Sequence, residues 1–184
     1  FGNDGDFSHR AMVNRMNGEL ANDLGNLAQR VLSMVHKNCD AKVPNHGDFE
    51  QEDRNLLGIA QGLLGHTRSC LDVQAFHEAL EAIWVVIRAA NAYVDHQAPW
   101  KLRKENPERM MVVLYTLTET IRMLALILQP YMPGSCARML DQLAISEGDR
   151  TFDAFGPAYA LKGGTALPKP EGVFPRFADD EEVA

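Results

Sequence analysis

Apolar residues recur at intervals of three and four along most of this chain, a spacing that is typical of amphipathic α-helices. The first helix is expected to begin after a Ser8 cap, and the Asn-Gly pair at residues 17–18 should kink or divide it. Its apolar positions are Met12, Met16, Leu20, Leu24, Leu27, Val31, Met34 and Val35.

The middle of the chain predicts two more helices. A turn at residues 44–47, PNHG, precedes a helix over about residues 48–70. Asp72 is expected to cap the next helix, which Pro99 ends. The stripe that this helix should bury comprises Val73, Phe76, Leu80, Ile83, Trp84, Ile87, Ala90 and Val94.

The last third of the chain changes character at Ser146. Before it, Asn106 caps a fourth helix that has Pro107 at its first position and ends at Leu128, and a short fifth helix covers residues 135–143. After it, Gly, Pro and aromatic residues indicate turns, with room for a short helix near Phe152.

The predicted fold is therefore all-α, an antiparallel helical bundle of about five main helices with an irregular C-terminal extension. We expect the bundle to span residues 1–146 and the extension residues 147–184. The extension should pack on the bundle or on a catalytic half that is absent from this chain. It ends in an acidic tail at residues 178–184, which we expect to be solvated.

Composition narrows the functional classes. A formal net charge of −7 argues against a generic, charge-driven nucleic-acid binder, although it leaves room for a small specific RNA site. Cys39, Cys70 and Cys136 form no CxxC pair, which suits a reducing, cytoplasmic compartment. The longest apolar run, residues 123–128, is shorter than the roughly 20 residues that span a bilayer, so no membrane attachment is expected.

No catalytic or metal-binding signature is present. The His77-Glu78 pair lacks the second histidine of a zinc-binding helix, and position 81 is another glutamate. The Gly-Gly pair at residues 163–164 lacks the spacing and lysine of a phosphate-binding loop. We therefore expect no catalytic residue, metal site or cofactor in this chain.

The stretch at residues 91–104 reads NAYVDHQAPWKLRK, in which Pro99 interrupts a good helix. Three cations follow it: Lys101, Arg103 and Lys104. Trp100, between Pro99 and these cations, is either part of a packed corner or an exposed platform for something flat and negatively charged. Trp84 lies among aliphatic residues in mid-helix and is assigned to the core.

Four stretches resemble the anticodon-binding helical-bundle domain of the methionyl-tRNA synthetase family, a class I group. They are DGDFSHRAMVNRMNGELANDLGNLAQR (4–30), NAYVDHQAPWKLRK (91–104), LILQPYMPGSCARMLDQL (126–143) and PKPEGVFPRF (168–177). LANDLGNLAQR and the FPRF ending point to the methionine enzyme in particular. The resemblance implies recognition of the CAU anticodon for a ligase that attaches methionine to tRNA(Met) in an ATP-dependent reaction.

The resemblance also implies roles for individual residues. Trp100, with Pro99, would stack on the first anticodon base, and Asn26 and Arg30 would hydrogen-bond anticodon bases. The last two lie at i and i+4, so both side chains emerge on one helix face. Weaker phosphate contacts are expected from Lys101, Arg103 and Lys104, with His96 assisting. Structural support for the corner is expected from Asn91, Tyr93 and Asp95.

The family's HIGH and KMSKS signatures are absent, so the chain is expected to be the C-terminal portion of the enzyme and inactive alone. ATP with magnesium, and zinc, would belong to the catalytic half. The implied partners are the anticodon stem-loop of tRNA(Met) and that catalytic half, in a monomeric enzyme. The alternatives are a stand-alone non-catalytic RNA-binding bundle, the same domain of a leucine, isoleucine or valine enzyme, and a purely structural bundle.

A first prediction concerns catalysis. The purified chain should give no methionine-dependent exchange between ATP and pyrophosphate, because it carries none of the residues that bind and activate methionine in the family. The measurement is incorporation of labelled pyrophosphate into ATP. Exchange that requires methionine would contradict the assignment of this chain to the non-catalytic part.

Overall fold

The computed structural model describes residues 8–177, so the acidic tail at 178–184 lies outside the described residues. The helices are α1 (His9–Arg15), the π-helix η1 (Met16–Gly25), α2 (Asn26–Asn38), α3 (Gln51–Asp72), α4 (Phe76–Gln97), α5 (Pro99–Glu105), α6 (Pro107–Leu128) and α7 (Pro133–Gln142). Three 3₁₀ turns follow, η2 (Glu147–Asp149), η3 (Phe152–Phe155) and η4 (Pro157–Tyr159). Residues 8–177 contain no β-strand, which confirms the all-α prediction.

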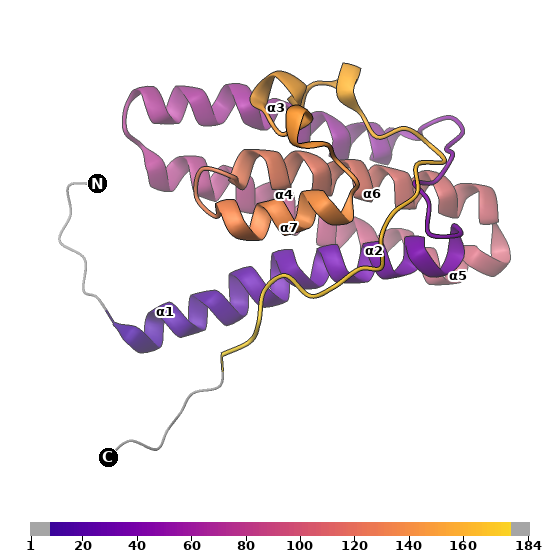
Figure 1. Cartoon of the computed structure of the whole chain (residues 1–184), viewed down its shortest axis with the longest axis horizontal. Coiled ribbons are helices and arrows are strands. Elements are labelled where there is room, and N and C mark those ends of the chain that lie inside the picture. The colour runs from indigo at the N-terminus through magenta and orange to yellow at the C-terminus, as the bar shows by residue number, and fades with distance from the viewer. Residues whose placement is uncertain (1–7, 178–184) are drawn as a thin grey trace, which may run out of the picture.

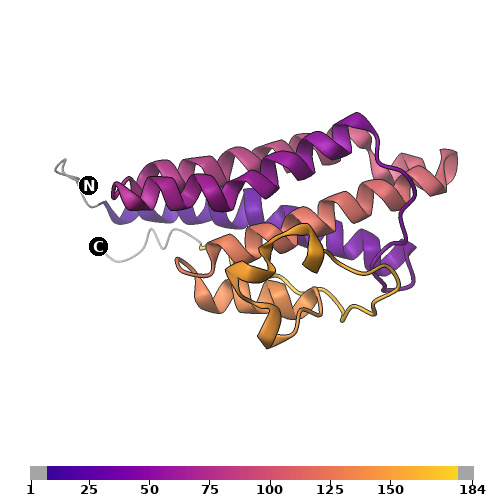
Figure 2. The ribbon, with the colours of Figure 1, turned by 90° about the horizontal axis from the view of Figure 1, so that it is seen from above.

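The long helices form a bundle in which neighbours in sequence reverse direction (Figures 1 and 2). The short connection after Asp72 makes α4 antiparallel to α3. At one end of the bundle lies α5, and the first turn of α1 lies at the other (Figure 1). Two predicted caps are confirmed, because Ser8 accepts from the backbone N–H of Ala11 and Asn106 from that of Arg109.

Helix α6 is the core of the bundle and is buried from Val112 to Leu128. By length and composition it could cross a membrane, with a mean hydropathy of 1.7 over 18 residues. However, 94% of that window is buried inside the protein. The surrounding helices therefore cover its apolar surface, as is typical of the central helix of a globular bundle.

The extension is tied to α6 by buried polar groups. The carboxylate of Glu119 pairs with Arg122 one turn later and accepts the backbone N–H of Leu161 at 3.0 Å. The Arg122 guanidinium also donates to the carbonyls of Ala154 (2.7 Å) and Phe155 (3.0 Å). A buried ion pair is tolerable only when its remaining donors and acceptors find partners, and here the extension supplies them.

The connection between α3 and α4 differs from the prediction. Asp72 does not cap a helix; it is the last residue of α3, and the chain reverses through Gln74 at φ 59°. Val73 and Phe76 are 74% and 37% exposed, so the expected buried stripe was wrong at these two positions. They lie at the tip of the hairpin, beyond the helices that cover the rest of the stripe from Ile83 onward.

Two other expected boundaries also moved. The chain reverses after α2 at Asp40 and Ala41, both with positive φ, and residues 44–47 form an irregular segment rather than a turn. The next helix begins at Gln51 instead of residue 48 because Glu50 and Asp53 form a reciprocal capping box there.

Residues 17–18 neither kink nor divide the first helix. Instead, the π-helix η1 joins α1 to α2 in one rod, and the C-terminal segment lies on it. The side chain of Asn17 donates to the carbonyl of Phe177 and accepts its N–H, both at 2.8 Å. A Cβ at Gly25 would lie 2.9 Å from the carbonyl oxygen of Leu20 and 3.3 Å from the ring of Phe174. The wide turn and the overlying ring thus require glycine at position 25.

We predict that Gly25→Ala destabilises the protein by about 1–3 kcal/mol, because the new methyl group must displace backbone or Phe174. The matched control is Gly58→Ala on α3, where nothing lies within 4 Å of the added atom. Helix propensity alone should make that variant more stable by about 0.5–1 kcal/mol. Urea unfolding followed by circular dichroism measures the stability of both variants. If Gly25→Ala is as stable as the wild type, glycine is not required at position 25.

Candidate nucleic-acid interface

A buried carboxylate organises the end of the bundle that carries α5. Asp53 is fully buried and accepts from the Tyr93 hydroxyl, the Glu50 backbone N–H and the Arg109 guanidinium (Nη2–Oδ1, 2.8 Å). Burial raises the pKa of Asp53, but these hydrogen bonds outweigh it, so that the pKa lies below its ordinary value. Burial, and then the hydrogen bond to the same carboxylate, raises the pKa of Tyr93. One charged group thereby joins α3, α4 and α6.

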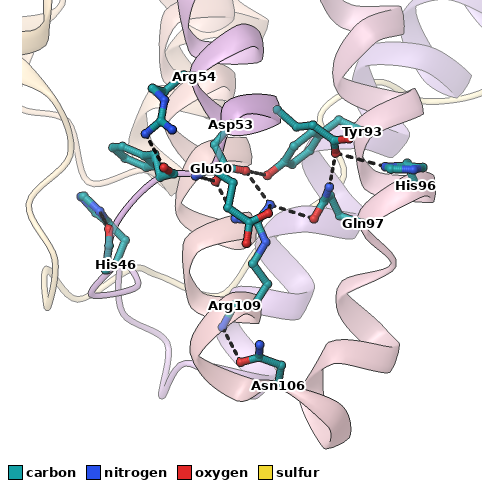
Figure 3. A network of polar contacts seen from close by, with 12 residues as sticks. His46, Glu50, Asp53, Arg54, Tyr93, His96, Gln97, Asn106 and Arg109 are labelled. Atoms are coloured by element: carbon teal, nitrogen blue, oxygen red, sulfur yellow. Dashed lines mark hydrogen bonds and ion pairs between the residues drawn. The ribbon is translucent and has the colours of Figure 1, made fainter.

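The network continues to the last turn of α4 (Figure 3). Arg109 also donates to the side-chain oxygen of Gln97 at 2.8 Å, and Gln97 in turn donates to Glu52. His96 lies 3.2 Å from the same Glu52 carboxylate. The end of α4 is therefore held on two sides, immediately before the proline of the corner.

The corner itself is built differently from the prediction. Pro99 does not simply end a helix; it is the first residue of α5, a position that suits proline because its missing N–H needs no partner there. The break is at Ala98, which adopts a left-handed conformation (φ 46°, ψ 58°) that is strained for a residue with a Cβ. The carbonyl of Ala98 accepts from Lys101 N at 2.8 Å and starts the new helix.

Helix α5 has a packed side and an exposed side. Pro99 is buried and Leu102 is half-buried against the core, whereas Trp100 is 46% exposed. The other exposed residues on α5 are Lys101, Arg103, Lys104 and Glu105. The three cations pair with no carboxylate in the part of the chain that the structure describes. Trp84, by contrast, is 9% exposed, which confirms its assignment to the core.

The structure brings Arg30, Asp95 and Trp100 together across α2, α4 and α5. Arg30 Nη2 lies 2.9 Å from Asp95 Oδ1, and the guanidinium carbon lies 5.8 Å from the centre of the Trp100 ring. This distance is within the range of a cation–π contact. The other N–H groups of Arg30 have no partner among residues 8–177. Asp95 therefore holds the guanidinium in place while most of its donors stay available to a ligand.

Asn26 lies one turn before Arg30, at the first position of α2. Its side chain is exposed and makes no hydrogen bond within residues 8–177, so it is not a buried group bonded to backbone. Asn91 of α4 donates to the carbonyls of Asp23 (3.2 Å) and Ile87 (3.1 Å). That amide joins α4 to η1 and so sets the distance between the two sides of the site.

The residues that sequence reasoning missed are those that hold the corner: Asp53, Arg109 and Gln97. Asp53 did carry a signal, since it lies three positions after Glu50 and three before Leu56, on the apolar face of its helix. An acid on an apolar face requires a partner. Arg109 and Gln97 showed no such pattern.

Among residues 8–177 no group of His, Cys, Asp or Glu could hold a metal ion. The interface therefore offers stacking, a fork of hydrogen-bond donors, an amide and a local positive charge. These are the elements by which proteins read unstacked nucleic-acid bases.

Comparison with known proteins gives concordant matches. Residues 43–184 match the family described as the anticodon binding domain of methionyl tRNA ligase, and residues 1–32 match the family of class I (M) tRNA synthetases. The chain is 48% identical over 182 residues to methionine–tRNA ligase of Brucella suis biovar 1 (strain 1330), covering 99% of the chain and 35% of that protein. It is 50% identical over 181 residues to methionine–tRNA ligase of Mycobacterium tuberculosis (strain H37Rv), covering 96% of the chain and 34% of that protein.

Solved structures agree with these sequence matches. The apo crystal structure of M. tuberculosis methionyl-tRNA synthetase superposes with a TM-score of 0.93 at 49% identity, covering 97% of this chain and 36% of that one. The same enzyme bound by methionyl-adenylate gives a TM-score of 0.92 at 49% identity, covering 95% and 35%. The chain thus spans about a third of the length of the proteins that it matches.

We predict that Asp53→Asn lowers the free energy of unfolding at pH 7 by about 3–5 kcal/mol, because it breaks the buried ion pair and leaves Arg109 only the exposed carboxylate of Glu50, 3.6 Å away. The low pKa of Asp53 stabilises the native state above the ordinary carboxyl pKa, and this stabilisation is lost as pH falls through the native value. The difference in free energy of unfolding between wild type and Asp53→Asn should therefore become smaller as the pH is lowered.

The measurement is urea unfolding at a series of pH values, with Glu52→Gln as the control, since that carboxylate is half-exposed. The control should change stability by no more than about 1 kcal/mol. A gap between wild type and Asp53→Asn that stays constant with pH would contradict the ionised, paired state of Asp53.

Proposed function

This chain belongs to the methionyl-tRNA ligase family and matches its anticodon-binding domain, and from this we propose that it recognises the CAU anticodon of tRNA(Met). The relatives are methionine enzymes, so the leucine, isoleucine and valine alternatives are wrong. In the proposed whole enzyme, methionine is activated with ATP and transferred to tRNA by a part that this chain does not include. We further propose that the whole enzyme is monomeric and cytoplasmic and is not attached to a membrane.

The observation that carries the proposal is the position of Arg30 between Asp95 and Trp100. A guanidinium that is held at a known place beside an exposed aromatic ring can meet a base edge while the base stacks on that ring. Two different helices supply the two groups. The Asp53 network holds the end of α4 before the corner that carries Trp100, and Asn91 joins α4 to the rod that carries Arg30. A purely structural bundle would have no reason to leave this tryptophan half-exposed.

Different residues stack on the bases and recognise their edges. Trp100 accepts any base, because every base has a flat face, and it contributes affinity. Asn26 and Arg30 supply selectivity, since an amide offers a donor and an acceptor and a guanidinium offers a rigid pair of donors. Pro99 and the left-handed Ala98 set the direction of the platform.

The cations of α5 bind phosphates of the loop or stem. Their side chains, Lys101, Arg103 and Lys104, are exposed and unpaired by carboxylates within residues 8–177, so they are available to the backbone of an RNA. Contacts of this kind position the nucleic acid without specifying its sequence. His96 is less suited, because it already lies against Glu52.

Adenylate chemistry belongs to the rest of the enzyme. A relative has been solved with methionyl-adenylate, and we assign ATP, magnesium and zinc to the corresponding catalytic part of this protein. The remaining alternative, a stand-alone RNA-binding bundle, would use the same residues for the same contacts. The gene's reading frame upstream of Phe1 distinguishes the two.

We predict that Trp100→Ala weakens binding of every anticodon hairpin by about 1–3 kcal/mol, the contribution of one stacked base. Arg30→Lys should keep the charge but lose the fork, so it should reduce the preference for CAU over a scrambled loop. Binding is measured by tryptophan fluorescence at low salt, and by fluorescence anisotropy of labelled RNA for the Trp100 variants.

The control is Trp84→Phe, which removes the buried tryptophan and should leave both affinity and selectivity unchanged. Quenching by CAU RNA should persist in this variant and disappear in Trp100→Phe. If both Trp100→Ala and Arg30→Lys bind CAU and scrambled hairpins like wild type, the anticodon site lies elsewhere.

A further inference from the structure

One ridge of α4 runs along the seam between this helix and the first rod of the bundle. Its members, Trp84, Arg88, Asn91 and Asp95, follow one another at intervals of four, three and four residues, so they lie on one face. Contacts across the seam establish the direction of that face. Asp95 binds Arg30 of α2, and Asn91 binds the carbonyl of Asp23 in η1.

The next position along the ridge is Arg88. It lines an open pocket of about 690 Å³ between η1, α4 and the end of α6, together with Arg15 and Glu19 on the opposite side of the seam. Arg15 is 77% exposed and pairs with Glu19 at 3.0 Å. Arg88 is exposed and makes no ion pair or hydrogen bond within residues 8–177.

We propose that Arg88 binds a backbone phosphate of the same RNA, beyond the anticodon loop, as a second contact on the seam. The inference rests on the proposed function, because the RNA must already be placed by Trp100 and Arg30. Arg88 and Asp95 are seven residues apart on one helix face, which is about 10 Å at 1.5 Å per residue. A strand that leaves the base-reading site along the seam therefore reaches the Arg88 guanidinium.

The two arginines of the pocket favour a phosphate over an apolar or cationic partner. A guanidinium presents paired donors that match two phosphate oxygens, and Arg88 has no competing protein acceptor in the described residues. Arg15 adds a second cation across the seam that has only a weak, solvent-exposed partner. Glu81, seven residues before Arg88 on the same face, repels an anion and marks where the subsite ends.

The contact should act on affinity but not on sequence preference. Each phosphate that a protein neutralises releases counterions, so the logarithm of the binding constant falls with the logarithm of salt concentration by nearly one unit per contact. Loss of Arg88 should therefore reduce this salt slope. Stacking and base reading at the other end of the seam should be unaffected, because the two sites are too far apart to couple directly.

The test compares Arg88→Gln with Arg68→Gln. Arg68 is an exposed arginine of α3 that lies over the ring of Phe152, on a different face of the bundle. Two RNAs are titrated by fluorescence anisotropy over a range of salt concentrations: a full CAU anticodon hairpin and a single-stranded heptamer with the loop sequence alone.

Arg88→Gln should weaken hairpin binding by roughly 3- to 10-fold and lower the salt slope by about one, while the CAU preference and heptamer binding stay as in wild type. Arg68→Gln should match wild type in every measurement. A wild-type preference for CAU together with unchanged hairpin affinity and salt slope in Arg88→Gln would overturn this inference alone. Absence of any CAU preference in the wild-type chain would overturn it together with the proposed function.

Discussion

The buried ion pair between Asp53 and Arg109 is the interaction on which the functional end of this bundle depends. The buried carboxylate of Asp53 is tolerated only because a guanidinium, a phenol hydroxyl and a backbone N–H all donate hydrogen bonds to it. These donors come from the start of α3, the last turns of α4 and the start of α6. The three helices can therefore meet in only one register, and the spare donor of Arg109 extends that register to Gln97, next to the corner.

Rigid helices, rather than a loop, carry the platform that results. The strained Ala98 persists because α4 is held before it and α5 packs after it. Trp100 then stands at a defined place relative to Arg30, and Asp95 holds the guanidinium ready. A site that is ordered before its ligand arrives loses less conformational freedom on binding. Such preorganisation suits the recognition of a few unstacked bases.

The C-terminal extension is an integral part of the packing. It supplies carbonyls to the buried Arg122 and an N–H to Glu119, which α6 alone would leave unsatisfied. Further on, the ring of Phe174 packs over Gly25 of the π-helix, and the backbone of Phe177 forms two hydrogen bonds with the side chain of Asn17. The first helix of the bundle and the last described residues therefore stabilise each other, and this fixes the rod that carries Asn26 and Arg30.

The amino-acid sequence by itself determined the helical class, the caps at Ser8 and Asn106, and the residue types at the proposed interface. These follow from spacing, from local hydrogen bonding and from short motifs, all of which act within a few residues. Only the tertiary structure decided that Val73 and Phe76 are exposed, that residues 99–105 form a helix and that residues 16–25 form a π-helix. It also decided that Arg30 meets Asp95 and Trp100, groups 65 or more positions away in the chain. Such outcomes depend on which helices cover which surfaces and on which distant donors a buried charge requires, and neither is encoded in a local pattern.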